Sequence, residues 1–129
     1  MEQGEYNFEL NQLSDRIYRN NKEKGFWDSQ RNVGELLMLV TSELGEAMEA
    51  HRKVKHADWK GFIDDLSTGD VDFAGSFRDN IKDTFEDEIA DSIIRLLDLC
   101  GGLKIDIDRH IEGKLKFNQT RPRLHGKSY

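Results

Sequence analysis

The sequence predicts an all-α fold, and three observations support this. The chain has 129 residues and a single proline, Pro122, so nearly every segment before it is free to form helix. Apolar residues recur at steps of three and four over long stretches, which is the spacing of one helix face. No stretch alternates convincingly in steps of two, so strands are expected to be few or absent. Because the length suits one domain with its own core, residues 1–129 are expected to form a single domain.

Four principal helices are expected, in a four-helix-bundle-like arrangement. The first covers residues 6–23 and stops before Gly25, which follows a lysine-rich end. The second covers residues 32–54 and has the highest density of apolar residues in the chain. Asn32 can cap its N-terminus, with Glu35 three residues later as the capping-box partner.

The second half of the chain is expected to contribute the other two principal helices. Residues 55–83 interrupt the helical pattern and are interpreted as an insertion with one or two short helices. The third principal helix covers residues 84–100 and is expected to stop at Gly101 and Gly102. The last covers residues 107–119.

Composition excludes several classes of protein. With 19 basic and 25 acidic residues the formal charge is −6, which argues against a dedicated nucleic-acid binder. Cys100 is the only cysteine, so a disulfide framework and a cysteine-based zinc site are both excluded. No apolar run approaches the roughly 20 residues that span a bilayer, and the first residues lack the pattern of a signal peptide. A cytoplasmic location without membrane association is therefore expected.

One carboxylate occupies an unusual position on the second helix. At about 100° per residue, Leu36, Ala47 and Ala50 all lie within about 40° of Glu43, so Glu43 falls inside the apolar stripe. Glu46, one turn later, lies at the edge of that stripe. A carboxylate directed at a core costs several kcal/mol unless it is paired or binds a cation.

The third helix repeats this spacing. Glu88 and Asp91 are three residues apart, so they lie about one turn apart on one face. Glu88 flanks the apolar stripe, whereas Asp91 and Asp98 are expected to lie further toward solvent. If the two helices pack face to face, their four carboxylates converge, and oxygen-only ligands of this kind suit Mg²⁺ or Mn²⁺.

The acids allow two other interpretations. A di-iron site would require Glu-x-x-His pairs, and neither acid pair has the histidine. The acids could instead form salt bridges, for which Arg95 is well placed. This second alternative stays open at the level of sequence.

The last helix carries a polar stripe that could bind phosphate. Lys114, Asn118 and Arg121 follow one another at i, i+4 and i+7, within about 60° of one another. Arginine grips phosphate through its bidentate fork and lysine acts as a point charge. The alternative is an ordinary positive helix end that complements the helix dipole.

Two segments together resemble a known family. Ser42-Glu43-Leu44-Gly45-Glu46 on one helix and Glu88-Ile89-Ala90-Asp91 on another match its ExxE and ExxD motifs in order. The chain is similar to the MazG-type nucleoside triphosphate pyrophosphohydrolases, an all-α superfamily that assembles as dimers or dimers of dimers. The stretch between the two motifs is longer here than the family's usual separation, because it contains residues 55–83.

The resemblance implies roles for particular residues. It implies that Mg²⁺, or Mn²⁺ in its place, is bound by Glu43, Glu46, Glu88 and Asp91. It implies that Lys114, Asn118 and Arg121 bind the polyphosphate and that Trp27 and Asn32 lie near the nucleotide. Trp27 could equally cover the core, as tryptophans in helix links often do.

The implied reaction is hydrolysis of a nucleoside triphosphate to the monophosphate and pyrophosphate. Glu46 is the candidate general base that accepts a proton from the attacking water. An alternative is a catalytically silent helical module that binds nucleotide or supports assembly. A less favoured alternative is a phosphoribosyl-ATP pyrophosphohydrolase, because such enzymes are usually shorter between the two motifs.

Overall fold

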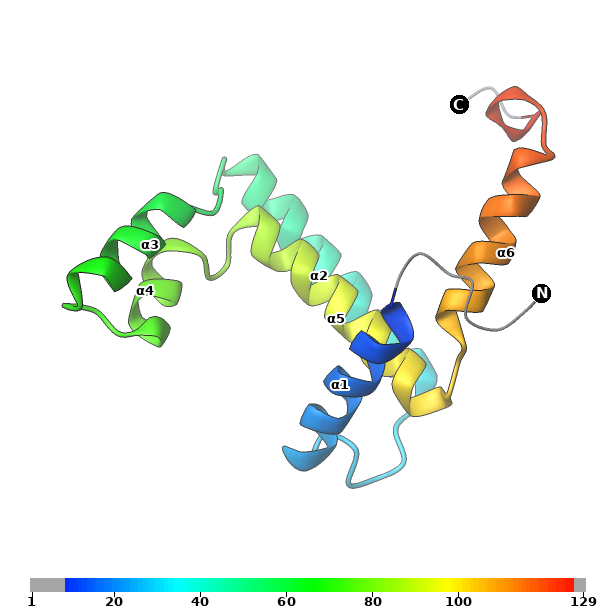
Figure 1. Cartoon of the computed structure of the whole chain (residues 1–129), viewed down its shortest axis with the longest axis horizontal. Helices are drawn as coiled ribbons and strands as arrows, with labels where there is room; N and C mark the ends of the chain where they lie inside the picture. Colours follow the sequence, from blue (N-terminus) through cyan, green and yellow to red (C-terminus); the bar gives the residue numbers. More distant parts are fainter. Residues whose placement is uncertain (1–8, 127–129) are drawn as a thin grey trace. The chain divides into compact units, whose positions relative to one another are not determined.

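A computed structural model of the chain describes residues 9–126, except for the side chains of residues 125 and 126. Within that range the structure has six α-helices, one short 3-10 helix and no strand, so the predicted all-α fold is confirmed (Figure 1). The elements are α1 (Leu10–Glu23), α2 (Val33–Arg52), α3 (Trp59–Thr68), α4 (Phe73–Asn80), α5 (Phe85–Leu103), α6 (Ile107–Gln119) and η1 (Arg123–Gly126). Residues 6–8 of the first expected helix lie outside the described range.

The chain divides into two compact units. Unit 1 comprises the described parts of Met1–Ser29 and Leu97–Tyr129, and unit 2 is Gln30–Leu96. Helix α5 begins in unit 2 and ends in unit 1. Whether the two units behave as one domain, as the sequence predicts, stays a prediction.

In unit 2, α2 packs against the first part of α5. Arg95 of α5 contacts Glu43 of α2, and the Phe85 ring lies 5.8 Å from the His51 ring, so the two helices run antiparallel. The face of α2 predicted to be apolar is the one that is buried, through Leu36, Val40, Ala47 and Ala50. The predicted cap is also present, because Asn32 Oδ1 accepts a hydrogen bond from the Glu35 N–H at 3.1 Å.

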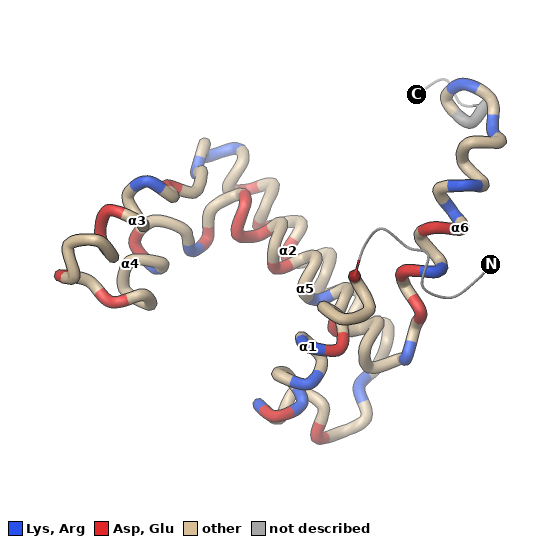
Figure 2. Tube along the Cα trace, in the orientation of Figure 1, with Lys and Arg blue, Asp and Glu red and all other residues tan. Residues whose placement is uncertain are grey.

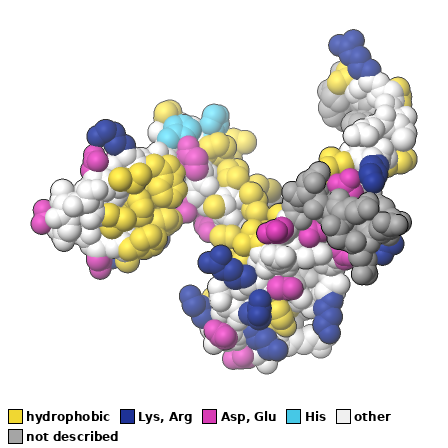
Figure 3. Space-filling view, in the orientation of Figure 1, with side chains coloured by type: hydrophobic (Ala, Val, Ile, Leu, Met, Phe, Trp, Pro, Cys, Tyr) yellow, Lys and Arg dark blue, Asp and Glu magenta, His cyan; other side chains and the backbone are white. Residues whose placement is uncertain are grey.

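The predicted insertion forms two short helices, α3 and α4, which pack on each other within unit 2 (Figure 1). Asp65 Oδ2 of α3 accepts hydrogen bonds from Ser76 Oγ at 2.9 Å and Asn80 Nδ2 at 3.0 Å of α4. The rings of Phe62 and Phe73 meet edge to face, 5.4 Å apart. Figure 3 shows a broad apolar surface over this hairpin. These polar and aromatic contacts define the insertion as a structured element.

Helix α2 ends in a Schellman motif that places a valine in a strained conformation. The Lys55 N–H donates to the Ala50 carbonyl at 2.9 Å and the Val54 N–H to the His51 carbonyl at 3.1 Å. This turn needs a left-handed residue, and Val54 has φ of 56°. A β-branched side chain is strongly disfavoured there. The Val54 side chain offers little packing in return, since the residue is 75% exposed.

Replacing Val54 with glycine is expected to raise the free energy of unfolding by about 1 kcal/mol. The left-handed conformation costs an L-residue about 1–2 kcal/mol, and the extra freedom of glycine in the unfolded chain offsets part of the gain. Urea unfolding followed by circular dichroism measures the change. Val54→Ala is the matched control, because it keeps the Cβ and should gain less. A glycine variant less stable than the parent would contradict this interpretation.

In unit 1, α1 and α6 cap each other's N-termini. The N–H groups of Leu10 and Asn11 donate to the two carboxylate oxygens of Asp108, at 2.8 and 3.2 Å. In return, Asn11 Oδ1 accepts hydrogen bonds from the N–H groups of Ile107 at 2.9 Å and Asp108 at 3.3 Å. Each side chain thus satisfies backbone donors that its partner helix leaves free. The arrangement fixes the start of α6 against α1.

The prediction that α5 stops at Gly101 and Gly102 is wrong, because the helix continues through both to Leu103. The two glycines allow close packing in unit 1. A Cβ at Gly101 would lie 2.6 Å from Tyr18 Cβ, and a Cβ at Gly102 would overlap the Trp27 indole. Here the need for close approach outweighs the tendency of glycine to end helices.

Candidate metal centre

Four carboxylates gather where α2 and α5 face each other in unit 2, and we call them the acid cluster: Glu43, Glu46, Glu88 and Asp91. Each helix contributes two of them, three residues apart and therefore on one face. One carboxylate oxygen from each of Glu43, Glu88 and Asp91 lies within 4.8 Å of the other two. Figure 2 shows acidic residues along these two helices. The structure therefore brings together the acids that the sequence singled out.

Two members of the acid cluster are removed from solvent. The Glu43 side chain is only 12% exposed, in agreement with its predicted place in the apolar stripe. Glu88 is 3% exposed and so lies deeper than the flank of the stripe on which the sequence placed it. The start of α5 is tied to the chain that follows α2, since the Phe85 N–H donates to the Lys55 carbonyl at 2.9 Å. Asp91 is half-buried and Glu46 is exposed.

The proximity of these acids changes their proton affinity. Burial, hydrogen bonds shared with Glu43 and Glu46 and the neighbouring negative charges raise the pKa of Glu88 to about 8. Burial and nearby carboxylates also raise the pKa of Asp91. Burial opposes ionisation of Glu43 as well, but hydrogen bonds with Glu88 and Arg95 and the charge of Arg95 lower its pKa below the usual value. Without a cation, the cluster therefore holds a proton on Glu88 at neutral pH.

Arg95 supplies one positive charge to the acid cluster. Its Nε lies 3.0 Å from Glu43 Oε1, so the salt bridge that the sequence left open as an alternative is present. One arginine does not balance four carboxylates. Glu88 Oε2 is buried and has no hydrogen-bond partner among the residues that the structure describes. A buried polar atom without a partner is rare in proteins and calls for an explanation.

The donor set fits a hard divalent cation. Octahedral Mg²⁺ holds oxygen ligands at about 2.1 Å, so opposite ligands are about 4.2 Å apart. The Glu43, Glu88 and Asp91 oxygens all lie within 4.8 Å of one another, which is compatible with that span. A cation there would lie against the buried Glu88 carboxylate and would favour its ionised form.

Two predicted nucleotide-proximal residues make other contacts in the structure. Asn32 caps α2 and is 11 residues before Glu43, which corresponds to about 16 Å along the helix axis. Trp27 belongs to unit 1, where its Nε1 donates to Asp98 Oδ1 at 3.0 Å and its ring meets Tyr18 edge to face at 5.2 Å. These contacts favour the interpretation of Trp27 as a residue that covers the core. The expectation that Asp98 lies toward solvent is wrong, because it is buried at this hydrogen bond.

The predicted phosphate-binding residues belong to unit 1. Lys114 Nζ lies 5.1 Å and the Arg121 guanidinium carbon 5.8 Å from the centre of the Phe117 ring, so both cations gather on one aromatic side chain. Asn118 is half-buried on the same helix. The acid cluster is part of unit 2.

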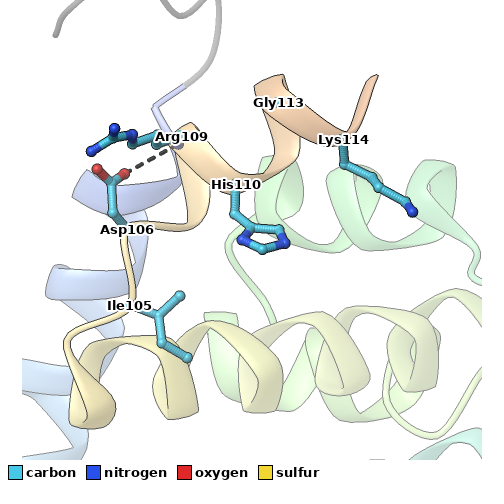
Figure 4. Close-up of a pocket in the computed structure, with 6 residues that line it drawn as sticks. All are labelled: Ile105, Asp106, Arg109, His110, Gly113 and Lys114. Atoms are coloured by element: carbon cyan, nitrogen blue, oxygen red, sulfur yellow. Dashed lines mark hydrogen bonds between the residues drawn. The ribbon is translucent and has the colours of Figure 1, made fainter. Parts of the chain in front are cut away.

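Lys114 also lines a hollow at the start of α6 (Figure 4). This hollow has a volume of about 520 Å³, and its polar walls include Arg109, His110 and Asp106. Asp106 accepts a hydrogen bond from the Arg109 N–H at 3.1 Å and thereby caps the helix. The cations of α6 thus border open space in which an anion could be accommodated.

Sequence reasoning missed two cations that lie near the acid cluster. Lys53 and Lys55 follow the end of α2 and line a second hollow together with Glu46 and Glu88. A signal was available, because the basic run begins directly after the helix that carries Glu43 and Glu46. The proximity of Lys55 to Glu88 depends on tertiary contacts and could not be derived from helical spacing.

Comparison with known proteins gave no match among protein-family models, curated proteins or solved structures. The resemblance to the MazG-type superfamily therefore depends on the two motifs and their order. In the described part of the chain, no helix combines the length and the apolarity needed to cross a membrane.

Proposed function

We propose that the protein is a divalent-cation-dependent nucleoside triphosphate pyrophosphohydrolase of the MazG type. The observation that carries the proposal is the buried Glu88 carboxylate, whose Oε2 has no described partner and which lies beside Glu43 and Asp91. Mg²⁺, or Mn²⁺ in its place, would be held by Glu43, Glu88 and Asp91, with Glu46 at the exposed side.

The residues of the acid cluster would divide the chemical work. When bound, a divalent cation neutralises phosphate charge and lowers the pKa of water. Glu46 is exposed and borders open space, so it can accept a proton from a water that attacks the α-phosphorus. Glu43 is held in place by Arg95 at 3.0 Å, which preserves its ionised form. Positioning and charge thus account for most of the proposed catalysis.

Analysis of products tests the proposal. The protein is incubated with Mg²⁺ and each of a panel of canonical and modified nucleoside triphosphates, and the products are separated by anion exchange. We expect equal amounts of nucleoside monophosphate and pyrophosphate, and no turnover when a chelator removes the cation. Release of orthophosphate would contradict cleavage between the α and β phosphates.

The Glu43–Arg95 ion pair favours a second candidate, a silent module that binds nucleotide or supports assembly. In such a protein the arginine would be a structural counter-ion and no cation would be needed. It predicts a nucleotide-dependent rise in melting temperature that is unchanged by a chelator. The pyrophosphohydrolase predicts a rise that requires Mg²⁺.

A homodimer, or a dimer of dimers, is also part of the proposal. Helices α2 and α5 expose large apolar side chains, including Leu44 at 50% and Met48 at 60%. These two residues border an apolar groove of about 370 Å³ whose lining also includes Phe85 and Ile89. Exposed apolar side chains gathered at a groove are typical of an interaction site. A second copy of the chain that covers it would bury surface that one copy leaves in water.

Met48→Glu is expected to convert the dimer to monomer. A charge placed in an apolar interface is desolvated without a partner, which should raise the dissociation constant at least about a hundredfold. Sedimentation velocity at micromolar concentration measures the change. Lys60→Glu is the control, because it alters charge at an exposed site on α3. A parent protein that is monomeric at these concentrations would contradict the assembly.

A further inference from the structure

A hollow of about 280 Å³ lies in unit 2 between the end of α2 and the start of α5. Its polar walls are two members of the acid cluster, Glu46 and Glu88, together with Glu49, Asp83, Lys53 and Lys55. Pockets for whole small molecules usually begin at about 300 Å³. The hollow is therefore of a size for part of a nucleotide, with the remainder outside it.

The backbone of Lys55 is fixed to both helices. Its N–H donates to the Ala50 carbonyl of α2 at 2.9 Å, and its carbonyl accepts from the Phe85 N–H of α5 at 2.9 Å. Lys55 is thus held at the wall that also contains Glu88, three residues after Phe85. No ion pair joins the Lys55 side chain to another described residue. Its charge is available to a ligand in the hollow.

Lys53 has only a weak competing partner. Its Nζ lies 3.3 Å from Glu49 Oε1, and Arg52 Nη1 lies 3.9 Å from the other oxygen of the same carboxylate. The side chains of Lys53 and Glu49 are both more than half exposed, at 60% and 53%. Exposed pairs of this kind contribute little. Lys53 can exchange Glu49 for a more highly charged anion, and Arg52 remains beside Glu49.

The acids and the lysines that line the hollow together suit a polyphosphate held by a cation. The carboxylates of the acid cluster repel phosphate unless a cation lies between them, whereas a lysine ammonium attracts it directly. We propose that Lys53 and Lys55 bind the β and γ phosphates of the triphosphate, which leave together as pyrophosphate, while the α phosphate faces the acid cluster. This assignment rests on the proposed function. It places phosphate-binding cations in the same unit as the acids.

Binding of inorganic pyrophosphate in the presence of Mg²⁺, measured by titration calorimetry, tests the assignment independently of turnover. Lys53→Ala and Lys55→Ala are each expected to weaken binding about tenfold, and the double variant about a hundredfold. Lys55→Arg should stay within about threefold of the parent, because it keeps the charge. Lys60→Ala, which removes an exposed lysine of α3, should leave binding unchanged. The Michaelis constant for the triphosphate should rise in parallel with the dissociation constant.

The outcomes separate the two levels of the proposal. If the parent hydrolyses triphosphates and the double variant binds pyrophosphate within twofold of it, the assignment of Lys53 and Lys55 is overturned and the proposed function stands. If the parent neither hydrolyses triphosphates nor binds pyrophosphate with Mg²⁺, both are overturned. Circular dichroism of each variant establishes that the fold is intact, which is expected because the contacts that fix Lys55 come from its backbone.

Discussion

Glu88→Gln is expected to lower Mg²⁺-dependent hydrolysis by about three orders of magnitude. Glutamine keeps the size of the side chain but removes the charge of the most buried member of the acid cluster, which is 3% exposed. Loss of one charged ligand costs several kcal/mol of transition-state stabilisation, and each 1.36 kcal/mol is tenfold in rate. The turnover number with a saturating deoxynucleoside triphosphate measures the effect. The rise in melting temperature on addition of Mn²⁺ should disappear as well.

Two variants make this prediction specific. Glu43→Gln is expected to have a comparable effect, because its oxygen belongs to the same group within 4.8 Å. Glu35→Gln changes an exposed acid that lies two turns before Glu43 on α2. This control variant should leave turnover unchanged. If Glu88→Gln retained more than a tenth of the parent activity, the assignment of Glu88 as a cation ligand would be wrong.

The free energy of unfolding of the cation-free protein is expected to fall as the pH rises from about 4.5 to about 8. The pKa of Glu88 is raised to about 8 in the folded protein, whereas its ordinary value is 4.5. Between these values the folded state binds more protons than the unfolded state, so raising the pH favours unfolding. The difference of 3.5 units sets an upper limit of about 5 kcal/mol on the loss. The raised pKa of Asp91 acts in the same direction.

Urea unfolding at several pH values, with a chelator present, measures this loss. Glu88→Gln cannot ionise and should remove most of the slope, so the variant should be more stable than the parent at pH 8. The lowered pKa of Glu43 affects stability only below about pH 4.5 and leaves this window unchanged. Saturating Mg²⁺ should also restore the free energy of unfolding that the parent loses at high pH. A parent whose stability is as flat as that of Glu88→Gln would contradict the buried, proton-binding environment of Glu88.

Helical spacing predicted most of the acid cluster but underestimated how deeply Glu88 is buried. Glu43 was predicted correctly inside the apolar stripe, because the periodicity of α2 is regular across Leu36, Val40 and Ala47. Glu88 is more deeply buried than its own helix indicates. The backbone hydrogen bond between Lys55 and Phe85 ties the end of α2 to the start of α5, and no local pattern encodes it.

Other differences between sequence and structure also have a tertiary cause. Gly101 and Gly102 resemble a helix stop, but they lie within α5 because Tyr18 and Trp27 pack where side chains would be. Asp98 is buried because the Trp27 indole covers it and donates a hydrogen bond to it. Lys55 and Glu88 line one hollow only because the two ends of the insertion meet. In each case the partner is distant in the sequence, so periodicity alone gives no signal.

Hydrolysis in water enriched in ¹⁸O tests the proposed reaction most directly. The protein is incubated with Mg²⁺ and a deoxynucleoside triphosphate, and mass spectrometry identifies the product that carries the label. If the acid cluster directs water to the α-phosphorus, one ¹⁸O atom appears in the nucleoside monophosphate and the pyrophosphate is unlabelled. Label in pyrophosphate or orthophosphate, or no turnover of any triphosphate, would contradict the proposed function.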